Sequence, residues 1–218
     1  MTQLTHMKTS VPGLYASAPE PLPFAPSLHI RAFLLQRERG NVLVYAVTGL
    51  ESEAAAIEEL GGIERHYLGH RHEAAFASDW VTAPLFVHER ERESVESRHH
   101  VRGTFSRRHV LDDDLEVVPI PGHTAGATAY LWDNGEHRFL FTGDTVYLDG
   151  GEWVAAVLES SDRAAYVESL EAIKELDFDV LVPWAATAGE PAHSVTSHAG
   201  ARRRIDTIIE RLRRGANS

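Results

Sequence analysis

The chain contains no cysteine among its 218 residues. It therefore forms no disulfide, offers no thiolate to a metal ion and has no cysteine nucleophile, so any metal site must use imidazole and carboxylate groups. No apolar run approaches the roughly 20 residues of a membrane-spanning helix, and the N-terminus lacks the charged-then-apolar pattern of a signal peptide. These absences predict a cytoplasmic protein that does not enter a membrane.

Positive charge is also scarce, because 21 Lys and Arg stand against 32 Asp and Glu, for a net charge of −11. An acidic chain is a poor partner for nucleic acid or an acidic membrane surface. The sequence also lacks a phosphate-cradling glycine loop and the G-x-S-x-G elbow of serine hydrolases. We therefore expect a small-molecule substrate or ligand as the partner. The sequence does not indicate which oligomeric state the protein adopts.

The length suits a single domain over residues 1–218, without repeats or linkers. Residues 1–27 read as a loose lead-in with a short strand near Leu14-Tyr15, and residues 103–111 allow no assignment. Apolar runs predict strands at 29–35, 41–47, 63–69, 84–88, 115–118, 127–132, 138–141 and 178–182, the first two forming a hairpin. Helices are predicted at 51–60, 89–97, 162–176 and 197–214. This mixture favours a layered α/β fold.

A histidine held in a Gly/Pro turn stands between two of these strands, in Pro119-Ile120-Pro121-Gly122-His123-Thr124-Ala125-Gly126. Proline fixes φ, and glycine permits backbone angles that other residues resist, so the turn can hold the imidazole in one place. Loops at strand ends are where a sheet scaffold usually carries its site. His123 is therefore a candidate functional residue.

Two further strands end in the same manner. The run 65–69 leads into His70-Arg71-His72, and the run 138–141 leads into Thr142-Gly143-Asp144-Thr145. Side chains at i and i+2 of a strand project to the same side, so His70 and His72 could bind one ion together. With thirteen histidines in the chain, one such pair is weak evidence. The joint pattern, with glycine-supported turns at His123 and Asp144, favours a metal site over isolated surface histidines.

These segments resemble the ordered signatures of the metallo-β-lactamase superfamily: Gly69-His70-Arg71-His72, Pro121-Gly122-His123-Thr124-Ala125-Gly126 and Phe141-Thr142-Gly143-Asp144-Thr145. The resemblance runs from about His29 to the last helix. It implies an αββα sandwich, in which two mixed β-sheets face each other, helices cover the outside and the metal site lies at one edge. It also implies His70, His72, His123 and Asp144 as metal ligands.

The chain departs from the family pattern at the second metal. In the first motif, H-x-H-x-D-H, the Asp and last His positions hold Ala74 and Ala75, and Ala185 stands where a late histidine is expected. Alanine offers no ligand atom, so of the second metal's ligands only Asp144 remains, and we predict one ion. Glu73, His193 and His198 do not match the motif spacing and are not predicted as replacements. The family's early buried Asp is missing too, since Val44-Tyr45-Ala46 stands there.

The resemblance then implies a hydrolase with one ion, zinc or alternatively iron, acting on an ester, thioester or lactam. Three imidazoles leave a fourth position open on zinc and can lower the pKa of bound water towards about 7. Asp144 is the predicted catalytic residue, holding the water and accepting its proton. Thr124 and Thr145 are candidates for hydrogen bonds to the ligands, and Trp184 is predicted to fill part of the vacated second site.

Two alternatives stay open at this point. His70, His123 and Asp144 form a 2-His-1-carboxylate set, which suits a mononuclear iron oxygenase. The three lost ligands also suit a degenerate, non-catalytic member that binds a small molecule or protein partner in the old cleft. Glutathione thioesters are not specifically indicated, because the sequence given lacks the extra helical domain of hydroxyacylglutathione hydrolases.

Overall fold

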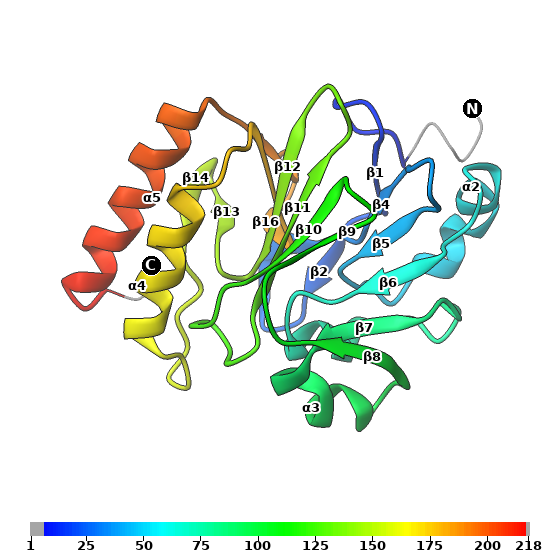
Figure 1. Cartoon of the computed structure of the whole chain (residues 1–218), viewed down its shortest axis with the longest axis horizontal. Coiled ribbons are helices and arrows are strands. Elements are labelled where there is room, and N and C mark those ends of the chain that lie inside the picture. Colours follow the sequence, from blue (N-terminus) through cyan, green and yellow to red (C-terminus); the bar gives the residue numbers. More distant parts are fainter. Residues whose placement is uncertain (1–6, 217–218) are drawn as a thin grey trace.

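Two six-stranded sheets form the centre of the molecule, and helices lie outside them (Figure 1). The structure is a computed structural model that describes residues 7–216, so the first six residues of the predicted lead-in lie outside the described part. Helices α4 and α5 cover one side of the sheets, and α2 and α3 lie on the other. The predicted αββα sandwich of mixed sheets is therefore confirmed.

The first large sheet has the strand order β1-β4-β5-β6-β7-β8. Its strands begin antiparallel and become parallel from β5 onward. Their bounds are β1 (Leu14–Ala16), β4 (Phe33–Leu35), β5 (Val42–Val44), β6 (Arg65–Tyr67), β7 (Leu85–His88) and β8 (Val101–Phe105). Strand β8 lies partly in the segment that the sequence left unassigned.

The second large sheet has the order β17-β15-β12-β11-β10-β9 and is antiparallel except for the pair β12 and β15. Its bounds are β9 (His109–Leu111), β10 (Leu115–Pro119), β11 (Thr128–Asp133), β12 (Arg138–Gly143), β15 (Val180–Pro183) and β17 (Ser194–Val195). The main core fills the space between the two sheets with buried aromatic rings, among them Phe33, Tyr45, Tyr130 and Phe141. Removing this apolar surface from water is the main stabilising contribution.

A third sheet, which the sequence did not predict, has the order β14-β13-β16-β3-β2. Its strands are β2 (Glu20–Leu22), β3 (Ala25–Ile30), β13 (Tyr147–Asp149), β14 (Glu152–Val154) and β16 (Ala185–Thr187). The run 29–35 is therefore not one strand: its first residues pair with β16, and only Phe33–Leu35 pairs with β5. The third sheet brings Leu22, Leu28 and Ala185 to the wall of a pocket of about 600 Å³.

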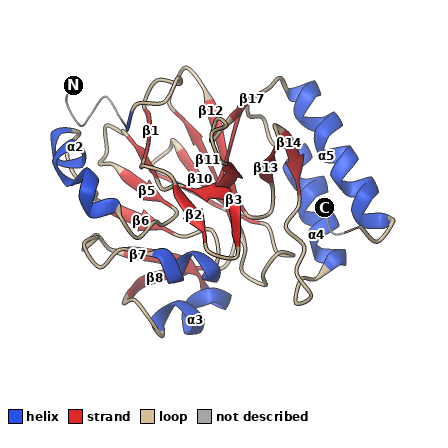
Figure 2. Cartoon of the chain, turned by 180° about the vertical axis from the view of Figure 1, so that it is seen from behind, coloured by secondary structure: helices blue, strands red, loops and turns tan. Residues whose placement is uncertain are grey.

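The helical segments are η1 (Leu50–Glu53), α2 (Ala54–Glu59), η2 (Arg71–Phe76), η3 (Glu89–Glu91), α3 (Arg92–Glu96), α4 (Arg163–Lys174) and α5 (His198–Arg213). Helices α4 and α5 pack side by side over the second large sheet, as seen from behind in Figure 2. Each begins at a capping side chain, Asp162 and Ser197, which accepts from backbone amides of the first turn. No helix within residues 7–216 is both long and apolar enough to cross a bilayer.

Candidate metal centre

Four side chains predicted as ligands converge from three strand ends. His70 and His72 follow β6, His123 stands in the loop between β10 and β11, and Asp144 follows β12. One potential ligand atom from each of the four lies within 4.8 Å of all the others. Within the described part of the chain, no other group of three or more His, Asp or Glu residues meets this test.

The side chains of His70 and His72 do meet, but the prediction that strand alternation places them on the same side was wrong. His70 has extended backbone angles, but His72 lies in the 3₁₀ helix η2, so the pair is not placed by the alternation of a strand. The rings of His70 and His72 lie 5.1 Å apart and almost perpendicular. The helical turn after His70 brings His72 back towards His123, whose ring lies 5.2 Å away.

Glycine is needed in the turn that carries His123. Gly122 has a φ of +146°, and a Cβ at this position would lie 2.4 Å from the Cα of Tyr166. The Gly122 carbonyl also accepts from the amide of Asp162, at the start of α4. The loop thus sits directly on α4, which fixes the position of His123 relative to the sheet.

Outer hydrogen bonds decide which nitrogen of two imidazoles faces the cluster. The Nδ1 of His70 lies 2.7 Å from Glu73 Oε1, and the Nδ1 of His123 lies 2.6 Å from the carbonyl oxygen of Ala156. Each Nδ1 donates to its oxygen acceptor, and each Nε2 points inward. His72 instead presents Nδ1, which lies 3.2 Å from His123 Nε2.

The donor set fits a metal ion. His70 Nε2 is buried without a hydrogen-bond partner, although Asp144 Oδ2 lies 3.3 Å away. A buried polar nitrogen without a partner is costly, and a cation at the centre of the cluster would satisfy it. Asp144 Oδ2 also lies 3.7 Å from His123 Nε2, so the carboxylate faces the same point.

Two carboxylates, the buried Glu73 and the partly exposed Asp144, give this centre a demand for positive charge. Burial favours neutral His70, but the carboxylates of Glu73 and Asp144 outweigh it and raise the pKa of His70 to about 10. Burial and the neighbouring imidazoles lower the pKa of His72 and of His123 to about 4, so both are neutral with lone pairs to donate. Burial opposes ionisation of Asp144, yet the surrounding imidazoles, His70 first, hold its pKa below the usual range.

Alanine stands at the three positions where the resemblance implies ligands for a second ion. Ala75 and Ala185 line the pocket beside the four-residue cluster, while Ala74 packs into a small apolar core. Trp184 is almost fully buried, with its ring 5.6 Å from that of His70 and its indole nitrogen donating to the Ala46 carbonyl. His193 contacts Ser10 and does not line this pocket.

Sequence reasoning missed the residues that orient the centre. Glu73 is fully buried and accepts from His70 and from the Gly69 amide, so it is an orienting group rather than a ligand. Tyr45, with a φ of 68°, donates its hydroxyl to Val182 and accepts from the Gly143 amide, next to Asp144. Thr124 was predicted to bond a ligand, but its hydroxyl has no partner among the described residues. Among the described residues, the hydroxyl of Thr145 likewise has no hydrogen bond to any of the four predicted metal ligands.

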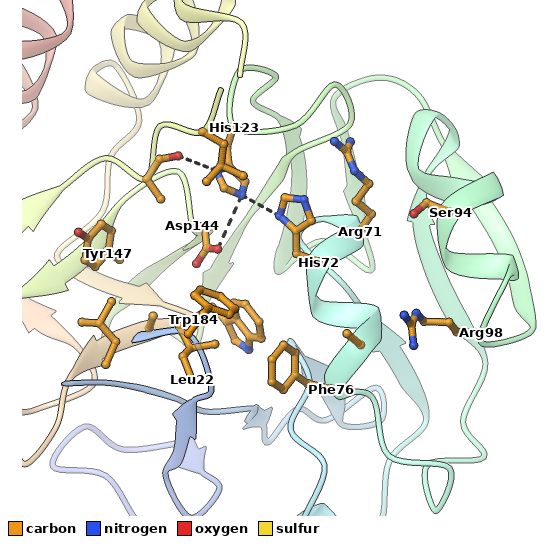
Figure 3. Close-up of a pocket in the computed structure, with 16 residues that line it drawn as sticks. Leu22, Arg71, His72, Phe76, Ser94, Arg98, His123, Asp144, Tyr147 and Trp184 are labelled. Carbon is orange, nitrogen blue, oxygen red and sulfur yellow. Dashed lines mark hydrogen bonds and ion pairs between the residues drawn. The ribbon is translucent and has the colours of Figure 1, made fainter. Parts of the chain in front are cut away.

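A pocket of about 600 Å³ opens beside the cluster (Figure 3). His72, His123 and Asp144 line it, so a molecule held there reaches the cluster directly. Most of the remaining wall is apolar: Leu22, Phe24, Leu28, Ala75, Phe76, Tyr147, Ala156, Leu158, Trp184 and Ala185. Mostly apolar pockets with a few convergent polar groups are typical of small-molecule sites.

The sandwich fold and a His/Asp cluster at the strand ends define a metallo-hydrolase-like protein. A sequence model of the metallo-beta-lactamase superfamily matches residues 29–185, and the chain belongs to this superfamily. Among solved structures, a metallo-beta-lactamase family protein of Thermus thermophilus aligns with a TM-score of 0.64 and 19% identity, covering 94% of this chain and 81% of its own. A Cronobacter sakazakii metallo-beta-lactamase with a HARLDQ motif aligns with a TM-score of 0.65 and 13% identity, covering 95% of this chain and 96% of its own.

Curated relatives match only in part. An uncharacterised protein of Bacillus subtilis (strain 168), YmaE, is 28% identical over 163 residues, which is 69% of this chain and 60% of that protein. A hydroxyacylglutathione hydrolase of Pectobacterium atrosepticum is 34% identical over 73 residues, or 34% of this chain and 26% of that enzyme. The chain thus spans less than two thirds of either relative.

Proposed function

We propose that this protein is a metal-dependent hydrolase with one ion, held by His70, His72 and His123 and faced by Asp144. The observation that carries the proposal is the convergence of four potential ligand atoms within 4.8 Å of one another, among them His70 Nε2, which is buried without a hydrogen-bond partner. Zinc is the proposed ion because three imidazoles with an open fourth position are its usual catalytic ligand set. The proposed substrates are esters, thioesters or lactams.

In this mechanism the chain supplies orientation and a proton acceptor. When bound, the ion supplies Lewis acidity for an acyl carbonyl and for water. Glu73 and the Ala156 carbonyl fix the rings of His70 and His123. Asp144 Oδ2 accepts the proton of the attacking water, and its lowered pKa means that it is ionised at neutral pH.

The number of ions follows from the charge and the missing ligands. Two carboxylates, the buried Glu73 and the partly exposed Asp144, would balance the charge of one divalent cation. A second divalent cation would meet alanine at three former ligand positions and would leave buried positive charge unbalanced. The local similarity to a hydroxyacylglutathione hydrolase makes thioesters a substrate class to test first.

The test compares hydrolysis with oxidation on the same purified protein. Zinc-loaded protein should cleave chromogenic esters, thioesters or a lactam faster than the His70→Ala/His123→Ala variant, which lacks two of the three imidazoles. Iron in the isolated protein together with oxygen uptake would instead support the oxygenase alternative. Bound ion without turnover on any of these substrates would contradict the hydrolase and leave a binding protein.

A further inference from the structure

The pocket beside the histidines has two chemically different sides. In the close-up, Tyr147, Leu22 and Trp184 lie on one side of His72, and Arg71, Ser94 and Arg98 lie on the other (Figure 3). The cluster that would carry out hydrolysis therefore stands between an apolar wall and a pair of arginines. A bound molecule that spans the pocket meets both sides at once.

The arginine side carries one uncompensated positive charge. Arg71 lies 3.5 Å from the buried carboxylate of Glu91, which offsets its charge. Arg98 is exposed at the end of α3, and its guanidinium has no hydrogen bond or ion pair with any of residues 7–216. Asp144 is the single carboxylate among the residues that line the pocket, and it faces the histidines. Arg98 is therefore a cation without a paired carboxylate at the pocket, on a chain whose net charge is −11.

The apolar side presents a large ring to solvent. Phe24, in the turn between β2 and β3, is 80% exposed and yet lines the pocket. Leu158, 43% exposed, belongs to the same wall. Apolar side chains at a pocket mouth are stabilised when a ligand covers them, and exposed apolar patches of this kind commonly mark binding sites.

We propose that the pocket binds an acyl compound with an apolar group at one end and a carboxylate at the other. This inference rests on the proposed function, and it narrows the substrate to an anionic ester or thioester. The apolar group lies against Phe24 and Trp184, and the carboxylate pairs with Arg98. A guanidinium presents paired N–H donors that match the two oxygens of a carboxylate.

Two ligands of equal shape, one anionic and one neutral, test the proposed carboxylate site by binding alone, without turnover. Metal-loaded protein is titrated in a calorimeter with 4-phenylbutanoate and with the neutral 4-phenylbutanamide. We expect the carboxylate to bind about tenfold more tightly, as a charge-assisted hydrogen bond allows. Arg98→Gln should bring the two ligands to equal affinity. Arg102→Gln, which changes an exposed arginine of β8 outside this pocket, should leave the preference intact.

Phe24→Ser tests the apolar half of the proposal. It should weaken the binding of both ligands severalfold and equally. Equal affinity of the two ligands in the wild type, or a carboxylate preference that survives Arg98→Gln, would overturn the inference. The second result would mean that the ion itself holds the carboxylate.

Hydrolysis of the neutral ester phenyl acetate is measured in parallel. Turnover without an Arg98-dependent preference contradicts only this inference. The preference without turnover on any ester, thioester or lactam contradicts only the proposed hydrolase.

Discussion

Replacing Asp144 with alanine or asparagine is expected to lower turnover by about 100-fold or more while one ion per chain remains bound. Positioned general bases contribute on the order of 10² to 10⁴ in rate. Asp144 Oδ2 faces His70 Nε2 and His123 Nε2 at 3.3 and 3.7 Å, so it lies where a water between these groups would lose its proton. The three imidazoles remain in both variants and keep the ion. Steady-state kinetics and metal analysis on the same preparation check both parts.

The matched control is Asp113→Asn, which removes a carboxylate of 89% exposure that does not line the pocket. Its kinetics should equal those of the wild type. Circular dichroism of each variant shows whether the fold is kept. Unchanged turnover in Asp144→Asn would remove Asp144 from the mechanism, and loss of the ion would show that it acts chiefly as a ligand.

Glu73→Gln is expected to weaken zinc binding by about 10- to 100-fold, the usual cost of losing an outer partner of a ligating histidine. Glu73 accepts from His70 Nδ1 at 2.7 Å and holds Nε2 of the same ring towards the cluster. It also supplies one of the two negative charges that balance a divalent ion. Competition with a chromogenic chelator measures the dissociation constant directly.

Glu91 provides the control for Glu73. It is equally buried and accepts from the amides of Arg71 and Gly126, but it touches no ligand histidine. Glu91→Gln should lower the melting temperature while the zinc dissociation constant stays within about threefold of the wild type. Glu73→Asp, which keeps the charge, should bind zinc more tightly than Glu73→Gln. Equal zinc affinity in the wild type and Glu73→Gln would show that Glu73 has only a packing role.

The convergence of the four predicted ligand residues could be anticipated because their signals are local. His123 and Asp144 each follow a strand in a turn supported by glycine, and the H-x-H pair follows another strand. Their convergence could be expected from the general rule that loops at strand ends carry functional sites. The superfamily and its layered fold followed from the same motifs.

The orienting groups could not be predicted because they depend on how chain segments fold back. Glu73 reaches His70 only because η2 begins directly after His70 and turns the carboxylate inward. The acceptor for His123 is the backbone carbonyl of Ala156, 33 residues away, which carries no side-chain signature. The third sheet was missed for a similar reason: the run 29–35 reads as one apolar strand, yet it changes partner between β3 and β4.

The central claim is a single ion at three histidines, and metal content per chain tests it most directly. Untagged protein and the His70→Ala/His123→Ala variant are analysed by elemental mass spectrometry after zinc is offered and excess is removed. We predict one equivalent in the wild type and none in the variant. Two equivalents would contradict the mononuclear centre, and no metal in the wild type would contradict both the centre and the hydrolase built on it.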